Sequence, residues 1–161
     1  MIDEAYREWN RSYDQIRRRG AVGNLNRGLA IVANGVAARL IAWPGNGFQT
    51  ESVHVVTLRP GEETDRYAYD MAEEAFFCVW GAGEVWLRDR WLTMAPGDIA
   101  FVPAAVPRAV RNAKRNGADF VLVNQITPPQ FDLYEPAGYY DRERGVMAFD
   151  AIEAAKRDMR R

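Results

Sequence analysis

The feature that most constrains this chain is a regular alternation of short apolar runs and turn signals between residues 58 and 112. The runs are rich in Val, Phe and Trp, and Gly, Pro and Asp residues separate them at intervals of about ten residues. Short strands of this kind, each followed by a turn, are typical of an antiparallel barrel or sandwich. The spacing therefore predicts an all-β fold.

Turn signals divide the chain into a series of predicted strands. Asn34-Gly35 is the strongest short hairpin signal in the sequence and joins the first two strands. Asp89-Arg90 and Pro96-Gly97 are predicted as turns, and Gly81-Ala82-Gly83 as a hairpin turn. The predicted strands are residues 29–33, 36–43, 53–58, 75–80, 84–87, 99–102, 108–111 and 120–126.

Helices are predicted at both ends of the chain. Apolar residues recur at three- and four-residue steps near the N-terminus, which predicts an amphipathic helix over residues 1–20 that Gly20 closes. Asp150 and Glu153 form a capping box for a last helix, which is predicted to run to about Met159. Two flanking helices are therefore expected beside the strands.

The chain is short enough to form a single domain of 161 residues. Its predicted parts are the N-terminal helix, a barrel over residues 29–127, and an aromatic loop with the C-terminal helix over residues 128–161. The loop contains too many aromatic residues for a free linker. It is expected to be ordered and to lie over the barrel or across a dimer contact.

The charge balance and the apolar content exclude several classes of protein. Lys and Arg number 21 and Asp and Glu number 22, and the net charge of -1 argues against a chain-wide attraction to nucleic acid. No apolar run is long enough to span a bilayer. The acidic residues Asp3 and Glu4 are not followed by the apolar stretch that a secretory signal requires. A cytoplasmic location without membrane contact is therefore expected. Cys78 is the only cysteine, so there is no intrachain disulfide and no thiolate zinc site.

Residues 61–112 also reproduce the spacing of two family motifs. The first motif, with two glycines, two metal-ligand positions and a glutamate, falls on Gly61, Tyr67, Tyr69, Glu74 and Gly81. The second motif falls on Gly97, Pro103, Ala105, Arg108 and Asn112. These positions correspond to a glycine, a proline, a second glycine, a metal ligand and an asparagine of the motif. The chain therefore resembles the cupin family, in which the three metal-ligand positions hold histidines. Here two tyrosines and an arginine replace them.

The resemblance implies the cupin fold, a single antiparallel β-barrel of the jelly-roll type, and a homodimer. Inward-facing side chains of neighbouring strands converge in such a barrel, and the resemblance places Tyr67, Tyr69, Glu74 and Arg108 in its cavity. It does not extend to the usual metal, because phenols and a guanidinium are poor ligands for iron, manganese or nickel. Arg108 stays positively charged and has no lone pair, so it repels a cation. We therefore expect neither a metal nor another cofactor.

Two interpretations of Arg108 stay open at this point. A buried guanidinium needs a negative partner, and Glu74 is the nearest candidate along the motif spacing. In the first interpretation the two residues form an internal ion pair that replaces the metal as a structural element. In the second, Arg108 binds a carboxylate or phosphate of a ligand with its two-pronged fork, and Glu74 or a tyrosine transfers protons.

Further side chains are candidates for contact with a ligand. Tyr67 and Tyr69, taken as residues in the middle of a strand, are either core aromatics or proton donors. Phe76 and Cys78 share one strand parity and face the same cavity, although a single buried cysteine is most simply a small apolar side chain. Trp80 is core, interface or an aromatic wall for the ligand.

Three functions are consistent with these residues. The first is a metal-independent enzyme of the isomerase or lyase type that binds a small polar or anionic metabolite, with Glu74 as general base or acid, a tyrosine as proton donor and Arg108 as anchor. The second is a non-catalytic protein that binds or senses a ligand in the same cavity. The third, ranked last, is a metal-dependent oxygenase with unorthodox ligands such as Glu74, His54 and Cys78.

Overall fold

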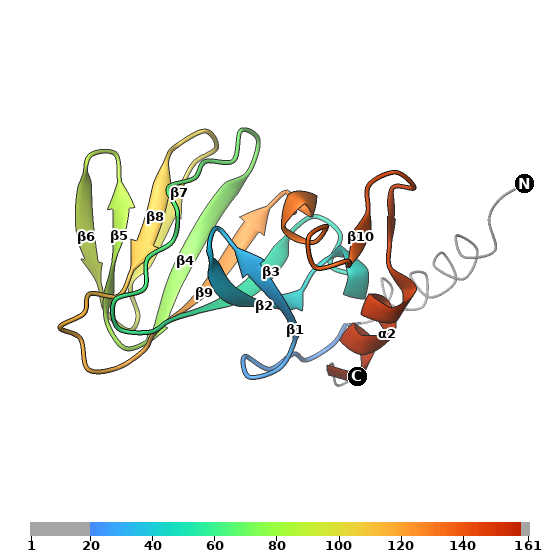
Figure 1. Ribbon diagram of the computed structural model, residues 1–161, viewed down its shortest axis with the longest axis horizontal. Coiled ribbons are helices and arrows are strands. Elements are labelled where there is room, and N and C mark those ends of the chain that lie inside the picture. Colours follow the sequence, from blue (N-terminus) through green and yellow to red (C-terminus); the bar gives the residue numbers. More distant parts are fainter. Residues whose placement is uncertain (1–19, 159–161) are drawn as a thin grey trace, which may run out of the picture.

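The structure is a computed structural model, and it describes residues 20–158 of the chain. Nearly all regular structure in this range is antiparallel β-sheet (Figure 1). The predicted N-terminal helix lies outside the described residues, and so does Met159, the predicted end of the last helix.

Two antiparallel sheets enclose the core. The larger has six strands in the order β1-β2-β3-β9-β4-β7, the smaller has three in the order β6-β5-β8, and the short strands β10 and β11 pair with each other. The strands are β1 Leu29–Ala33, β2 Val36–Ala42, β3 Ser52–Leu58, β4 Glu73–Trp80, β5 Gly83–Leu87, β6 Arg90–Met94, β7 Ile99–Val102, β8 Arg108–Arg111, β9 Phe120–Thr127, β10 Tyr140–Asp141 and β11 Val146–Met147. The predicted all-β antiparallel barrel is confirmed.

The strands of the larger sheet bury alternate side chains, as a sheet with one face on the core requires. In β9 the residues with even numbers are buried, whereas the residues between them are half-buried or exposed. The register of β3, β9 and β4 aligns the inward residues in two rows across the sheet, Ser52–Ile126–Glu74 and His54–Asn124–Phe76. Four polar side chains, those of Ser52, His54, Glu74 and Asn124, are therefore buried on the inner face of this sheet.

The turn predictions had mixed outcomes. Asn34-Gly35 joins β1 to β2 as predicted, with φ values of 50° and 86° that a primed hairpin turn requires. Pro96-Gly97 is also a turn. The Asp89-Arg90 prediction is wrong, because the turn lies at Arg88-Asp89 and Arg90 begins β6, a strand that the sequence pattern did not indicate. Gly81-Ala82-Gly83 is not a hairpin turn, because β4 pairs in the larger sheet and β5 in the smaller, so it forms a corner between sheets.

The segment of residues 59–72 runs beside β8 and extends the smaller sheet by an irregular edge. Tyr67 exchanges backbone hydrogen bonds of 2.9 and 3.0 Å with Arg108, and Glu63 forms a second bridge with Arg111. Tyr67 and Tyr69 therefore lie in a loop that leads into β4, and the prediction that they occupy the middle of a strand is wrong.

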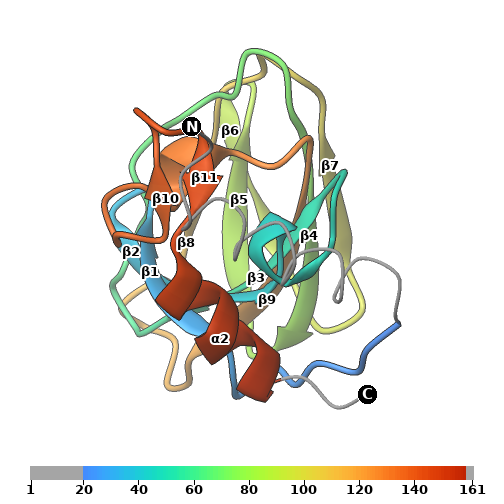
Figure 2. The same ribbon diagram turned by 90° about the vertical axis from the view of Figure 1, so that its right-hand side faces the viewer.

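The aromatic segment after β9 lies over the end of the larger sheet that is opposite to the smaller sheet (Figure 1). Tyr134 follows the 3-10 helix η2 (Phe131–Leu133) and is fully buried, and the Tyr139 hydroxyl donates a hydrogen bond of 2.8 Å to the Ala30 carbonyl oxygen. Helix α2 (Phe149–Asp158) begins one residue before the predicted cap, Asp150, and buries Ile152 in the core. Figure 2 shows this helix against β1, with which it is in contact.

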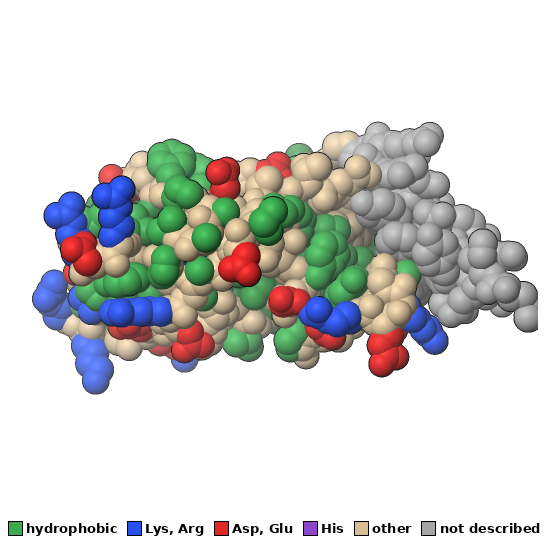
Figure 3. Space-filling model, turned by 90° about the horizontal axis from the view of Figure 1, so that it is seen from above, with side chains coloured by type: hydrophobic (Ala, Val, Ile, Leu, Met, Phe, Trp, Pro, Cys, Tyr) green, Lys and Arg blue, Asp and Glu red, His purple; other side chains and the backbone are tan. Residues whose placement is uncertain are grey.

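Surface charge is distributed unevenly. Figure 3 shows that Lys and Arg side chains gather at the end of the molecule that carries the smaller sheet, where exposed basic residues include Arg88, Arg90, Lys114 and Arg115. Arg108 belongs to the same sheet but is completely buried. None of the described helices has the length and apolar character needed to cross a membrane.

Candidate functional site

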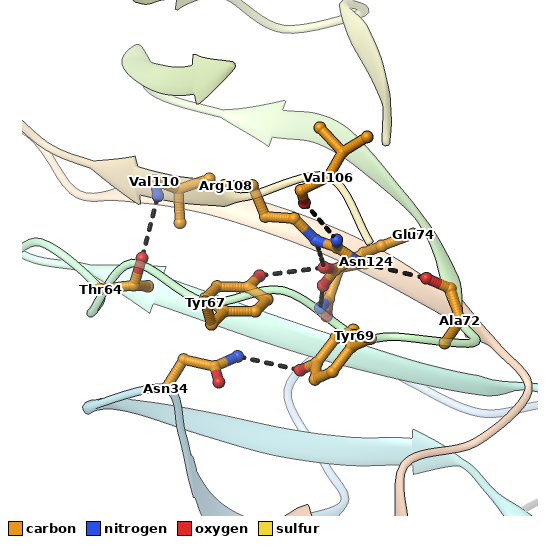
Figure 4. Close-up of polar contacts among 10 residues, drawn as sticks. All are labelled: Asn34, Thr64, Tyr67, Tyr69, Ala72, Glu74, Val106, Arg108, Val110 and Asn124. Carbon is orange, nitrogen blue, oxygen red and sulfur yellow. Dashed lines mark hydrogen bonds and ion pairs between the residues drawn. The ribbon is translucent and has the colours of Figure 1, made fainter. Parts of the chain in front are cut away.

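A buried ion pair crosses the barrel between the two sheets. Arg108 comes from β8 in the smaller sheet and Glu74 from β4 in the larger, and Arg108 Nε lies 2.9 Å from Glu74 Oε2. Both side chains are fully shielded from solvent. Figure 4 shows the pair at the centre of a group of polar residues from several elements. The sequence therefore brings together the two charged residues that its motif spacing singled out.

The other atoms of this pair also have partners within the chain. Arg108 Nη1 donates to the Val106 carbonyl oxygen at 2.7 Å, and Nη2 donates to the Ala72 carbonyl oxygen at 3.4 Å. The second carboxylate oxygen of Glu74 accepts a hydrogen bond of 2.7 Å from Asn124 Nδ2. Every nitrogen of the guanidinium thus donates to the protein itself. This arrangement favours the internal ion pair over a guanidinium that is free to bind a ligand.

Burial and hydrogen bonding act in opposite directions on Glu74. Burial raises the pKa of its carboxyl group, while the guanidinium of Arg108 and the hydrogen bonds from Asn124 and Tyr67 oppose the rise. Glu74 thus forms an ion pair with Arg108 at a position where burial by itself favours the protonated carboxyl group. A carboxyl group in this position is a good acceptor for a proton that is delivered through a hydrogen bond.

Two tyrosines lie against the guanidinium. Tyr67 donates a hydrogen bond of 3.0 Å to Glu74 Oε2, whereas the Tyr69 hydroxyl oxygen accepts one of 3.0 Å from Asn34 Nδ2. The two ring centroids are 5.2 Å apart, and Arg108 Cζ lies 5.4 Å from the centroid of Tyr67 and 4.9 Å from that of Tyr69. As whole residues Tyr67 and Tyr69 are half-buried, whereas the side chains of Glu74 and Arg108 are fully buried. The tyrosines are therefore the parts of this polar centre that a ligand can reach first.

The protonation of the tyrosines follows from burial. Desolvation raises the pKa of both hydroxyl groups and the negative charge of Glu74 raises it further, while Arg108 opposes the rise. Both phenols are therefore neutral hydrogen-bond donors at neutral pH. The two hydroxyl groups differ in their hydrogen bonds. Tyr67 donates its proton to Glu74, whereas Tyr69 accepts a hydrogen bond from Asn34 and can donate its own proton to another acceptor.

The residues at this centre do not fit the transition metal that the motif positions imply. Arg108 holds one of the ligand positions and binds the carboxylate that would be the best ligand. Among residues 20–158, no three His, Cys, Asp or Glu side chains lie close enough together to hold a metal ion. The neutral phenols of Tyr67 and Tyr69 would have to lose their protons against a raised pKa to replace histidine.

The other predicted ligand contacts lie in different places. Phe76 is buried on the inner face, where the register sets it beside Asn124. Cys78 is also buried but lies four residues from Glu74 along β4, which is about 13 Å along a strand. Trp80 is 64% exposed, so it is neither a core residue nor a wall inside the barrel, and its assignment to an interface stays a prediction. The register of β4 shifts between Cys78 and Trp80, which pairs with Val121 on the outer face.

A second group of buried polar side chains lies on the inner face, and of its members only His54 was considered from the sequence, as a possible metal ligand. His54 is fully buried, and neither ring nitrogen has a partner among the described residues; the same holds for Ser52 Oγ, Asn124 Oδ1, Trp43 Nε1 and the Tyr134 hydroxyl. A buried polar atom without a partner costs about 1–3 kcal/mol. Burial lowers the pKa of His54 to about 4, so the imidazole is neutral at neutral pH. The available signal was that polar residues interrupt apolar strands at inward positions.

A surface pocket of about 260 Å³ on the outside of the barrel has Glu74 among its lining residues, although the Glu74 side chain is fully shielded from solvent. It is lined by residues at one end of β4, β7 and β9, including Glu73, Phe101 and Gln125. Pockets that enclose drug-sized ligands have volumes of about 300–1,000 Å³. This pocket is smaller than that range.

Comparisons with known proteins agree with the geometry of the barrel and its motifs. Residues 54–124 match the family model of the cupin domain, a range that contains both motifs and the Glu74–Arg108 pair. This segment is a cupin domain. Among proteins of curated function, none matches this cupin in sequence.

Solved structures with the same fold are distant in sequence from this cupin. It is similar to KdgF from Halomonas sp., with a TM-score of 0.59 and 16% identity over 71% of this chain and 98% of that one. It is also similar to a predicted oxalate decarboxylase from Thermotoga maritima, with a TM-score of 0.59 and 12% identity over 67% of this chain and 99% of that one. At these identities the likeness shows the cupin fold alone.

Proposed function

We propose that this cupin is a metal-independent enzyme of the isomerase or lyase type that transfers protons on a small polar or anionic metabolite. The observation that carries the proposal is the hydrogen bond from Tyr67 to a buried carboxylate, Glu74, which is itself bound to the arginine at a metal-ligand position. General acid and base groups of this kind accelerate reactions by about 10²–10⁴-fold each.

The two tyrosines have complementary roles in this proposal. Tyr67 acts as the base, because it takes a proton from the substrate as its own proton moves to Glu74 Oε2. Tyr69 acts as the acid, because its oxygen accepts from Asn34 and its proton is available to the substrate. The substrate regains one proton for the one it loses in an isomerisation, and in a dehydration the returned proton leaves with the hydroxyl group as water. Glu74 then holds an extra proton and Tyr69 lacks one, and exchange of these protons with water restores both groups before the next turnover. Arg108 stabilises negative charge on either ring.

A specific observation also favours a second candidate, a cupin that binds or senses a ligand without turnover. All three guanidinium nitrogens of Arg108 donate to Glu74, Val106 or Ala72, so the charged centre is complete without a ligand. In this case the half-buried tyrosines contact the ligand and no proton is transferred. The two candidates differ in turnover and not in binding.

The experiment is a screen of metabolite pools by thermal shift, followed by NMR of each stabilising compound for conversion. Elemental analysis of the same preparation is expected to find less than stoichiometric iron, manganese and nickel. Tyr67→Phe and Tyr69→Phe should each lower kcat at least about 100-fold, whereas the control Tyr140→Phe, outside the centre, should not. Stabilisation without conversion supports the binding protein. Activity that depends on added metal would refute the proposal.

A further inference from the structure

Three buried polar side chains on the inner face of the larger sheet, together with Tyr134 from the aromatic segment, form a group that we call the neutral cluster: Ser52, His54, Asn124 and Tyr134. His54 and Asn124 are direct partners in the register of β3 and β9, and Ser52 lies two residues before His54 on the same face. Tyr134 comes from the aromatic segment, and its ring centroid is 6.3 Å from that of His54. The cluster thus lies between the sheet and the segment that covers it.

Five polar atoms of the neutral cluster have no hydrogen-bond partner in the part of the chain that the structure describes. They are Ser52 Oγ, both ring nitrogens of His54, Asn124 Oδ1 and the Tyr134 hydroxyl. Ser52 lies near Tyr134, but the two hydroxyl groups do not reach hydrogen-bond geometry. Nearly all buried polar groups in folded proteins have a hydrogen-bond partner, so these atoms indicate a partner from outside the chain.

The chemistry of the cluster defines that partner. It carries no carboxylate and no cation, since its single titratable base, His54, is neutral at neutral pH. Neutral imidazole offers one donor and one acceptor, the Asn124 oxygen is an acceptor, and the Ser52 and Tyr134 hydroxyl groups do both. A hydroxyl oxygen also donates and accepts. It therefore matches this set better than an anion, which would leave the acceptors unpaired.

We propose that the neutral cluster is a binding site for uncharged hydroxyl oxygens, supplied either by ordered water or by the hydroxyl groups of a sugar or polyol. Asn124 joins it to the catalytic centre, because its Nδ2 donates to Glu74 while its Oδ1 belongs to the cluster. A substrate that spans both regions carries hydroxyl groups on an uncharged end. The inference that the substrate carries hydroxyl groups on an uncharged end rests on the proposed function. The inference that the neutral cluster binds hydroxyl oxygens does not.

The sole histidine of the chain gives a direct test. In the ¹⁵N-labelled protein at pH 7, the two His54 nitrogen resonances report whether each nitrogen is hydrogen-bonded. We expect hydrogen-bonded shifts, and we expect glucose or glycerol to change them while glucose 6-phosphate changes them less. If the shifts show hydrogen bonding but neither neutral compound changes them, the site holds water and the substrate class is refuted. An equal response to glucose 6-phosphate would overturn the neutral character of the site.

A pair of matched tyrosine variants tests the site without any ligand. Tyr139→Phe removes a hydroxyl group that donates to Ala30, and it should lower the ratio of folded to unfolded protein by about fivefold. Tyr134→Phe should lower it by a similar factor if its hydroxyl group binds water. A Tyr134→Phe protein that is as stable as the wild type, together with His54 shifts that show no hydrogen bond, overturns the proposal. Tyr67→Phe distinguishes the two proposals, because it should abolish turnover and leave the glucose response of His54 intact.

Discussion

Replacing Arg108 by methionine should destabilise the barrel more than any other single loss of charge in the described residues. Methionine keeps much of the apolar volume but leaves the Glu74 carboxylate buried without its cation, and both side chains are fully shielded from solvent. Removing one member of a buried pair costs about 3–5 kcal/mol. For a domain of this size the melting temperature should fall by about 6–20 °C. Arg111→Met is the matched control, because Arg111 lies on the same strand as Arg108 and its ion pair with Glu84 of β5 is partly exposed, so the variant should lose about 1 kcal/mol or less.

The stability lost in Arg108→Met should depend on pH, because the protonation of the Glu74 carboxyl group depends on pH. Arg108 is the strongest influence that lowers the pKa of Glu74 against burial, so its removal raises that pKa further. A group whose pKa is raised on folding gives full stability below its unfolded pKa, 4.5, and loses it as the pH rises through the folded value. The difference between Arg108→Met and wild type should therefore be small near pH 4 and largest near pH 8.

Urea unfolding at several pH values, followed by tryptophan fluorescence, measures this difference. Adding Glu74→Gln to Arg108→Met should recover at least about 1 kcal/mol, because the second change removes the unpaired charge. If Arg108→Met loses no more stability than Arg111→Met, or loses the same amount at pH 4 and pH 8, the buried pair does not hold the two sheets together. The reasoning from charge burial would then be refuted.

The remaining predictions concern other parts of the molecule. Because the pKa of His54 falls from 6.5 to about 4 on folding, stability should drop by about 3 kcal/mol as the pH falls from 6.5 to 4, and urea unfolding of His54→Leu should lack that drop. Ala105 occupies a motif glycine position with φ of 61°, so Ala105→Gly should raise the free energy of unfolding by about 1 kcal/mol in the same assay. We still expect a homodimer, and light scattering of the full chain should give twice the mass of one chain; a monomer at micromolar concentration would contradict this.

The fold was predictable because turns carry local signals. Asn34-Gly35, Gly61 and Gly97 all have positive φ, a backbone conformation that glycine and asparagine adopt at little cost, so their spacing marked the ends of strands. Strand β6 was missed because Arg90–Met94 is mostly exposed and has no clear apolar alternation. Trp80 was misplaced because the bulge in β4 reverses which face a residue occupies, and no residue near Trp80 indicated it.

The candidate site was only partly predictable for a related reason. Motif spacing identified Glu74 and Arg108, since both lie within one continuous stretch of turns and strands. The neutral cluster depends on the register between β3 and β9, whose residues are distant in sequence, and on how the segment around Tyr134 folds back. A polar residue at an inward position, such as His54 or Asn124, shows only that a partner is needed. It does not identify the partner.

Asn124 connects the protonation state of Glu74 to the hydrogen bonds of the neutral cluster. Its amide has a donor end and an acceptor end, and the donor end bonds to the Glu74 carboxylate at 2.7 Å, so the acceptor end is left for the cluster. A protonated Glu74 can instead donate a hydrogen bond, and it would then favour the opposite orientation of the amide. The cluster would meet two amide donors in place of one acceptor. In the proposed mechanism, transfer of a proton to Glu74 would therefore change the hydrogen bonds available to a hydroxyl group beside His54, and it would couple proton transfer at the tyrosines to the binding of the uncharged end of the substrate.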